Sequence, residues 1–109
     1  MKRTRQRAST ALQPFEPKAE DIYSIEAVVQ ITQTPRHQIA VYCRHGLIAP
    51  VTLPERDGWW FDLEAIRVLR RIEWLRIDYD MNLAGLSIIS GLFREVERLR
   101  EEVRALRHS

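Results

Sequence analysis

Residues 23–50, YSIEAVVQITQTPRHQIAVYCRHGLIAP, contain two short amphipathic segments joined by a polar turn. Ser24 stands at an N-cap position before the first segment. Behind it, Ile25, Val28 and Val29 recur at helical spacing. The pattern predicts a helix that begins after Ser24 and buries one apolar face.

The second segment has its own start and stop signals. Thr34 is a favourable N-cap residue, and Pro35 fits the first helical position, where a missing N–H leaves no bond unmade. Ile39 and Tyr42 then share an inward face, and Gly46 can close the helix in the left-handed conformation. Two short helices connected by a tight turn predict a helix-turn-helix.

A β-hairpin is predicted next, from LIAPVTLPERDGWWFD at residues 47–62. Two prolines and the Asp57-Gly58 pair lie between its apolar ends, so ERDGWWFD fits the tip and the return strand. Trp59 and Trp60 are adjacent, and adjacent side chains of a strand point to opposite faces. One indole can therefore pack in the core while the other lies at the surface as an anchor, although the sequence does not decide which.

Two more helices complete the chain. Asp62 is an N-cap residue for LEAIRVLRRIEWLRIDY at residues 63–79. The predicted core stripe of that helix comprises Ile66, Leu69, Ile72, Leu75 and Tyr79, widened by Val68. Asn82 can cap a final helix that opens with the apolar stretch LAGLSIISGLF.

The end of the final helix carries a heptad seam. Its apolar side chains are spaced by four, three, four and three residues: Leu92, Val96, Leu99, Val103 and Leu106. Arginine and glutamate occupy the outer faces. About two heptads are too few for an isolated coiled coil, so the seam either pairs antiparallel with a second chain or folds back onto its own domain. The exposed apolar run favours a homodimer.

The predicted fold is a mainly α winged helix-turn-helix with a small β-hairpin wing and a long C-terminal helix. We assign residues 1–20 to a basic arm without regular structure, residues 21–80 to the winged helix-turn-helix and residues 81–109 to the C-terminal helix.

Charge and composition limit the function. The net charge is +2, and the arm alone contributes +3 from five basic and two acidic side chains, so the remaining residues sum to −1. A DNA-binding domain usually has a basic face, so this balance supports DNA binding only weakly. A single cysteine, Cys43, excludes an internal disulfide. Without a secretory signal or an apolar run of membrane-spanning length, we expect a cytoplasmic protein that does not bind membranes.

No catalytic constellation is present in the sequence: we find no Gly-rich phosphate loop, no His-x-x-x-His pair and no nucleophile with an evident base. We therefore expect neither an enzyme nor a cofactor. A metal site is the other possibility to consider, on Cys43, His45 and His37. Helical residues two apart diverge by about 200°, so Cys43 and His45 cannot share an ion. The sequence predicts no metal.

Over roughly residues 23–90, the helix-turn-helix, the Gly-aromatic strand and FDLEAIRVLRRIEWLR resemble the MerR-type DNA-binding domain. The resemblance implies a recognition helix and a wing that usually contact DNA through arginines. This sequence has Ala40 at the typical recognition-helix arginine, and Trp59 and Trp60 at the typical wing arginines. The possible DNA-binding residues that remain are Arg36, His37 and Arg44.

Within that superfamily the sequence is similar to the CbpM-like chaperone modulators, on GLIAP, WWFD, the Asp-x-Glu-Ala-Ile helix start and NLAGLSII. The resemblance implies a protein that binds the J-domain of a DnaJ-type co-chaperone and restrains Hsp70 by occupancy. J-domains carry a basic working helix, so acidic groups near the wing are expected to face it while a tryptophan anchors the contact. The predicted partner-binding residues are Trp59, Trp60, Asp57, Asp62 and Glu64.

Two other interpretations stay open. Heat-shock repressors of the same superfamily share the NLAG entry, which would make this chain a DNA-binding transcriptional regulator that uses Arg36, Arg44 and the basic arm. The other is an adaptor for a partner unrelated to chaperones. The missing arginines favour the modulator, because they remove charge-assisted phosphate contacts.

Overall fold

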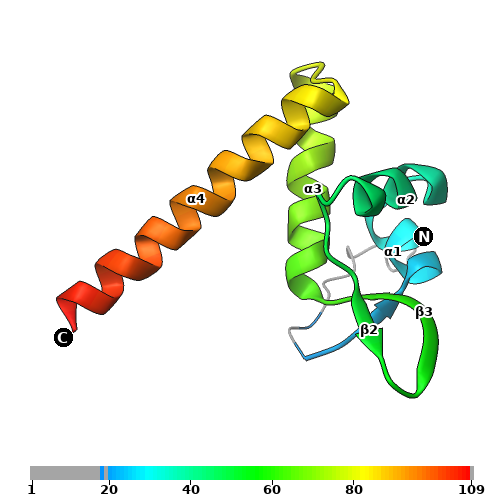
Figure 1. Cartoon of the computed structure of the whole chain (residues 1–109). Helices are drawn as coiled ribbons and strands as arrows, with labels where there is room; N and C mark the ends of the chain where they lie inside the picture. The colour runs from blue at the N-terminus through cyan, green and yellow to red at the C-terminus, as the bar shows by residue number, and fades with distance from the viewer. Residues whose placement is uncertain (1–17, 19, 109) are drawn as a thin grey trace, which may run out of the picture.

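The computed structural model describes residues 18 and 20–108, and the predicted arm at residues 1–20 lies almost entirely outside them. A three-stranded antiparallel sheet in the order β1-β3-β2 accompanies four helices. Helix α4 projects away from the domain formed by the other elements (Figure 1). This is the predicted mainly α winged helix-turn-helix. The elements are β1 (Tyr23–Ser24), α1 (Ile25–Thr32), α2 (Arg36–Arg44), β2 (Val51–Leu53), β3 (Arg56–Phe61), α3 (Leu63–Asp78) and α4 (Leu83–Arg107).

Three helices begin at their predicted caps. The side-chain oxygens of Ser24, Asp62 and Asn82 each accept a hydrogen bond from the backbone N–H three residues later, at 3.2, 2.9 and 2.9 Å. Each bond satisfies one donor that the helix cannot pair internally. Such a cap contributes about 1 kcal/mol to stability.

Helix α2 begins one residue later than predicted. Its N-cap is Pro35, whose carbonyl accepts the N–H of Ile39 at 3.2 Å. The predicted cap, Thr34, is instead buried, and its hydroxyl accepts a hydrogen bond from the hydroxyl of Thr32 at 3.0 Å. The Thr34 prediction is therefore wrong, because a local hydroxyl pair takes the place of the cap. Gly46 ends the segment at φ +73°, as predicted.

The core lies between the helix-turn-helix, the base of the sheet and α3. It includes most of the predicted inward residues of α1 and α2 and most of the predicted core residues of α3: Ile25, Val28, Ile39, Tyr42, Leu47, Ile48, Phe61, Ala65, Ile66, Leu69, Ile72, Leu75 and Leu86. Val29 and Val68 are partly buried and pack against this core. Tyr79 is an exception, being 60% exposed. Helix α3 ends at Asp78, so Tyr79 caps the helix and its ring packs edge-on against Trp74. Its placement in the core was wrong because helical spacing no longer applies beyond the last turn.

Strand β1 was not predicted. Its two residues pair with β3, Tyr23 opposite Phe61 and Ser24 opposite Trp60. A strand of two residues carries too little alternation to be read from sequence. The pairing fixes β3 between two neighbours and holds the start of α1 beside the wing.

Candidate functional site

The wing, the hairpin formed by β2 and β3, turns at Pro54–Glu55. Leu53 pairs with Arg56 across this turn. Proline sets the backbone angle that the first central position of a tight turn needs. ERDGWWFD therefore contains the second turn residue, Glu55, and the return strand, while Asp57 and Gly58 lie within β3.

A bulge in β3 accommodates the additional residues. Val51 pairs with Trp60 and Leu53 with Arg56, so two steps along β2 correspond to four along β3. Gly58 adopts φ +91° in this segment, a conformation that favours glycine. Because a bulge twists its strand and re-aims the side chains beside it, it sets the direction of the two tryptophans that follow.

Neither tryptophan belongs to the core. Trp59 is 39% exposed, Trp60 is half-buried, and the core residue of the strand is Phe61. Trp60 is engaged within the wing: its indole Nε1 donates to the carbonyl oxygen of Asp57 at 3.1 Å, and the guanidinium of Arg56 lies 4.9 Å from its ring centroid. Trp59 is therefore the more exposed indole of the two.

The three predicted carboxylates have different roles. Asp57 is exposed within the bulge, and Glu64 is exposed in the first turn of α3. Asp62 is half-buried, and its Oδ1 accepts the N–H of Ala65 as the α3 cap. Asp62 thus has a structural task, whereas Asp57 and Glu64 are accessible on either side of the β3–α3 junction.

The wing contains an arginine, Arg56, that was not among the predicted site residues. Arg56 opens β3, and its charge is balanced by its sequence neighbours Glu55 and Asp57. The guanidinium stacks on Trp60. Its position before the aromatic pair was visible in the sequence. Even with Arg56 included, the net charge of residues 55–57 is −1.

The possible DNA-binding residues Arg36, His37 and Arg44 are all exposed on α2. Arg36 forms a salt bridge with Glu26 of α1, and this hydrogen bond holds the pKa of the Glu26 carboxyl below its ordinary value. A phosphate group would have to compete with Glu26 for that guanidinium. His37 and Arg44 complete a polar helix face at the surface.

Cys43 is half-buried on the same helix. Burial raises the pKa of its thiol to about 11, with Arg44 acting weakly in the opposite direction. The thiol is therefore protonated at neutral pH, whereas metal binding needs the thiolate. Over residues 18 and 20–108, no group of three or more His, Cys, Asp or Glu side chains is arranged to hold a metal ion.

A partly buried polar network joins α2 to α3. The hydroxyl of Tyr42 donates to Glu73 and accepts a hydrogen bond from Gln38 at 2.9 Å. Arg76 donates to both carboxylate oxygens of Glu73, at 3.0 and 2.9 Å. The position of Tyr42 in the core was predicted from the sequence, whereas its hydrogen-bond network was not. Glu73 follows the core residue Ile72 in the sequence, and a glutamate next to a core position was the signal that could have indicated a polar network there.

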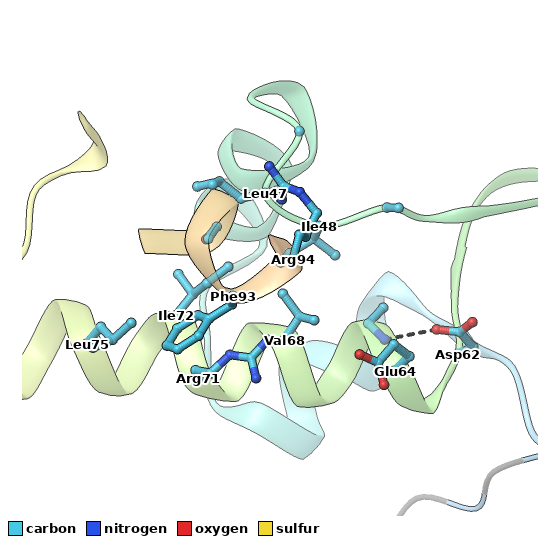
Figure 2. Close-up of a pocket in the computed structure, with 14 residues that line it drawn as sticks. Leu47, Ile48, Asp62, Glu64, Val68, Arg71, Ile72, Leu75, Phe93 and Arg94 are labelled. Atoms are coloured by element: carbon cyan, nitrogen blue, oxygen red, sulfur yellow. Dashed lines mark hydrogen bonds between the residues drawn. The ribbon is translucent and has the colours of Figure 1, made fainter. Parts of the chain in front are cut away.

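A cavity of about 370 Å³ lies in the angle between α3 and α4. Figure 2 shows its apolar wall, which comprises Leu47, Ile48, Val68, Ile72, Leu75 and Phe93. The guanidinium of Arg71 lies 4.3 Å from the Phe93 ring centroid. Asp62 and Glu64 also line the cavity, so it extends to the base of the wing.

The heptad seam is exposed along its whole length. Its members have exposed fractions between 42% and 71%: Leu92, Val96, Leu99, Val103 and Leu106. Helix α4 packs on α3 through its N-terminal part, where Leu86 and Ser90 are buried, and the rest extends into solvent (Figure 1). The seam therefore does not fold back onto its own domain. Among the described helices, none is both long and apolar enough to cross a membrane.

Most of the sequence matches one known family. The sequence model of the MerR HTH family regulatory proteins matches residues 23–108. The matched region runs from β1 through α4 and so includes the helix-turn-helix, the wing and both long helices. No curated protein matches the sequence. The chain belongs to the MerR helix-turn-helix family of regulatory proteins.

Proposed function

We propose that this protein is a cytoplasmic protein-binding member of its family. It binds the J-domain of a DnaJ-type co-chaperone through the wing and restrains Hsp70 by occupancy, without enzymatic activity or a cofactor. The observation that carries the proposal is the exposed Trp59 in a wing whose tip is slightly acidic. A wing that holds DNA needs cations for phosphate, whereas an exposed indole beside carboxylates suits a protein surface.

Burial of Trp59 can supply a useful part of the binding energy. Tryptophan has roughly 250 Å² of surface, so covering the 39% that is exposed removes about 100 Å² from water. At ~25 cal/mol per Å² this stabilises a complex by about 2–3 kcal/mol before ordering costs. Trp60 contributes indirectly, because its bond to Asp57 stabilises the bulge that presents Trp59.

The exposed carboxylates add electrostatic selectivity. Asp57 lies before Trp59 in the wing, and Glu64 lies just beyond β3. We expect both to face the basic working helix of a J-domain. Exposed charges of this kind mainly raise the association rate and depend on salt. The contact is therefore expected to weaken moderately at high ionic strength, with the indole retaining most of the affinity.

Calorimetric titration with the J-domain of a co-chaperone from the same source tests this proposal. We expect saturable binding with a negative heat-capacity change, which marks apolar burial. Trp59→Ala should weaken binding by about 30-fold, from the lower end of the burial estimate above. Ile88→Ala, which truncates an exposed apolar side chain on α4, is the control and should bind like wild type. An absence of heat with the wild-type chain would refute the proposal.

The seam supports a homodimer. In an antiparallel pair centred between Val96 and Leu99, Leu92 lies opposite Val103 of the second copy and Val96 lies opposite its Leu99, so apolar residues meet along the seam. Sedimentation of Leu99→Glu should show a monomer, because each copy would place a carboxylate in the apolar seam. Thr52→Glu adds the same charge at an exposed position of β2 and should leave the dimer intact.

DNA binding is the second candidate function, favoured by the family and by the exposed Arg36, His37 and Arg44 on α2. It predicts an affinity for promoter DNA that falls steeply with salt. Deletion of residues 1–7 and Arg44→Ala should each weaken that binding while leaving J-domain binding unchanged. Binding to DNA that does not depend on salt would argue against this function.

A further inference from the structure

A stripe of four exposed side chains follows the solvent face of α3. We call it the α3 stripe, and it comprises Arg67, Arg70, Trp74 and Ile77. Spacings of three, four and three residues place these side chains on one side of a helix. The opposite side of α3 carries its core residues, so the stripe has no role in packing the domain.

The C-terminal half of the stripe is apolar. Trp74 is 50% exposed and Ile77 is 64% exposed. The ring of Tyr79 meets Trp74 edge-on, with ring centroids 5.1 Å apart, and extends the patch beyond the helix end. Single exposed apolar residues are ordinary, but three adjacent large ones mark an interaction surface.

The N-terminal half is basic. Arg67 and Arg70 are exposed, and no salt bridge within residues 18 and 20–108 involves either. Nearby, Arg76 is bonded to Glu73 and Arg71 is stacked on Phe93. The stripe therefore presents two guanidinium groups whose charge is not matched by a carboxylate of the domain.

We propose that the α3 stripe is a second docking surface, and that it binds an acidic protein segment with an apolar side chain next to its carboxylates. Carboxylates would pair with Arg67 and Arg70, for which arginine has a suitable bidentate geometry. The apolar side chain would cover Trp74 and Ile77. Tryptophan and arginine are the residue types that dominate binding energy at protein interfaces.

A protein segment fits the stripe better than a nucleic acid does. The stripe is about 15 Å long, from ten steps along the helix at ~1.5 Å each. Cations occupy only its first half, and Asp78 and Asp80 follow the apolar half. A nucleic-acid backbone carries a charge at every nucleotide and would meet these carboxylates. The stripe also takes a partner of the opposite charge to the one proposed for the wing, so the two surfaces need not compete.

Peptide selection on the full chain tests the α3 stripe. A random library of phage-displayed peptides is selected in parallel on wild type and on the double variant Arg67→Glu, Arg70→Glu. We expect wild type to enrich peptides with Asp or Glu beside an aromatic or aliphatic residue, and the double variant to lose them. The best resynthesised peptide should bind the double variant and Trp74→Ala at least tenfold more weakly. Arg107→Glu, a single charge reversal of the same kind at the end of α4, is the control and should bind like wild type.

Two results would overturn this inference, provided that circular dichroism shows the variants folded. One is a set of selected peptides without acidic enrichment, and the other is unchanged peptide affinity in the double variant. A single-stranded oligonucleotide is included as a further probe. If it binds wild type and loses affinity in the double variant while no acidic peptide does, the stripe recognises nucleic acid instead.

Discussion

The hydroxyl of Tyr42 on α2 donates a hydrogen bond to the carboxylate of Glu73 on α3, although the two residues are 31 positions apart in sequence. The bond crosses the interface between the second helix of the helix-turn-helix and the helix that follows the wing. Tyr42 is fully buried and Glu73 is half-buried, so the bond forms where water competes little. It fixes how α2 is presented to solvent relative to the wing.

Tyr42→Phe should destabilise the fold by about 1.5–3 kcal/mol, because it removes a hydrogen bond to a charged acceptor while keeping the ring. Urea denaturation followed by circular dichroism measures the loss. Tyr79→Phe makes the same chemical change at an exposed helix end and should stay within about 0.5 kcal/mol of wild type. Equal losses in the two variants would mean that the bond contributes nothing.

The same network predicts a dependence of stability on acid. Burial alone would raise the pKa of Glu73, but hydrogen bonds from Arg76 and Tyr42 outweigh it and hold the pKa below its ordinary value. A carboxylate whose pKa is lowered in the folded state stabilises the protein above its unfolded pKa, and this stabilisation is lost as pH falls through the folded pKa.

Glu73→Gln should therefore lower stability at pH 7 and flatten its decline in the acidic range, where Glu73 takes up a proton. Denaturation curves at several pH values between neutrality and strong acid give the slope. Glu97→Gln, at an exposed position of α4, should keep the wild-type slope. A slope that remains steep in Glu73→Gln would assign the acid sensitivity to other carboxylates.

The Tyr42 phenol should titrate late. Burial and the neighbouring Glu73 raise its pKa to about 12. Since the neutral phenol is favoured in the fold, its stabilising effect is present below the unfolded pKa of about 10 and is lost as pH rises toward 12. Ultraviolet titration of the phenolate should show a late transition that is missing in Tyr42→Phe. A normal transition for all three tyrosines would contradict this prediction.

Cys43 should react slowly with alkylating reagents. Burial raises the pKa of its thiol to about 11, so little thiolate forms at pH 8, and the half-buried position limits access. Iodoacetamide labelling followed by mass spectrometry should be much slower for the folded chain than for the chain in denaturant. Similar rates in both states would show that the thiol is free in the fold.

Most of the fold could be predicted because its signals are local. Ser24, Asp62 and Asn82 cap helices by bonding to residues three positions later, and the core faces follow from helical spacing. The two misplacements lie at helix ends, where regular spacing no longer decides the position of a side chain. Thr34 pairs with a neighbouring hydroxyl instead of capping α2, and Tyr79 lies beyond the last turn of α3.

The candidate site was less predictable, because its geometry depends on how the strands of the wing pair. Alternation along a strand predicts that one tryptophan of the wing is exposed. Which of the two is the more exposed depends on the β3 bulge and on the hydrogen bond from Trp60 to Asp57, and the structure gives Trp59. Long-range packing thus decides which aromatic residues of a family domain remain available to a partner.

Gly58, the glycine of the wing, should be sensitive to substitution. At φ +91° an alanine is strained even though a Cβ there would have no atom within 4 Å, so Gly58→Ala should destabilise the fold by about 1–2 kcal/mol through the backbone alone. Gly91→Ala is the matched control, because it lies inside α4, where alanine is favoured by up to ~1 kcal/mol and meets only the end of the Arg94 side chain. Urea denaturation should therefore show shifts of opposite sign. A neutral Gly58→Ala would mean that the bulge relaxes freely, and the wing would then not hold Trp59 in one direction for a partner.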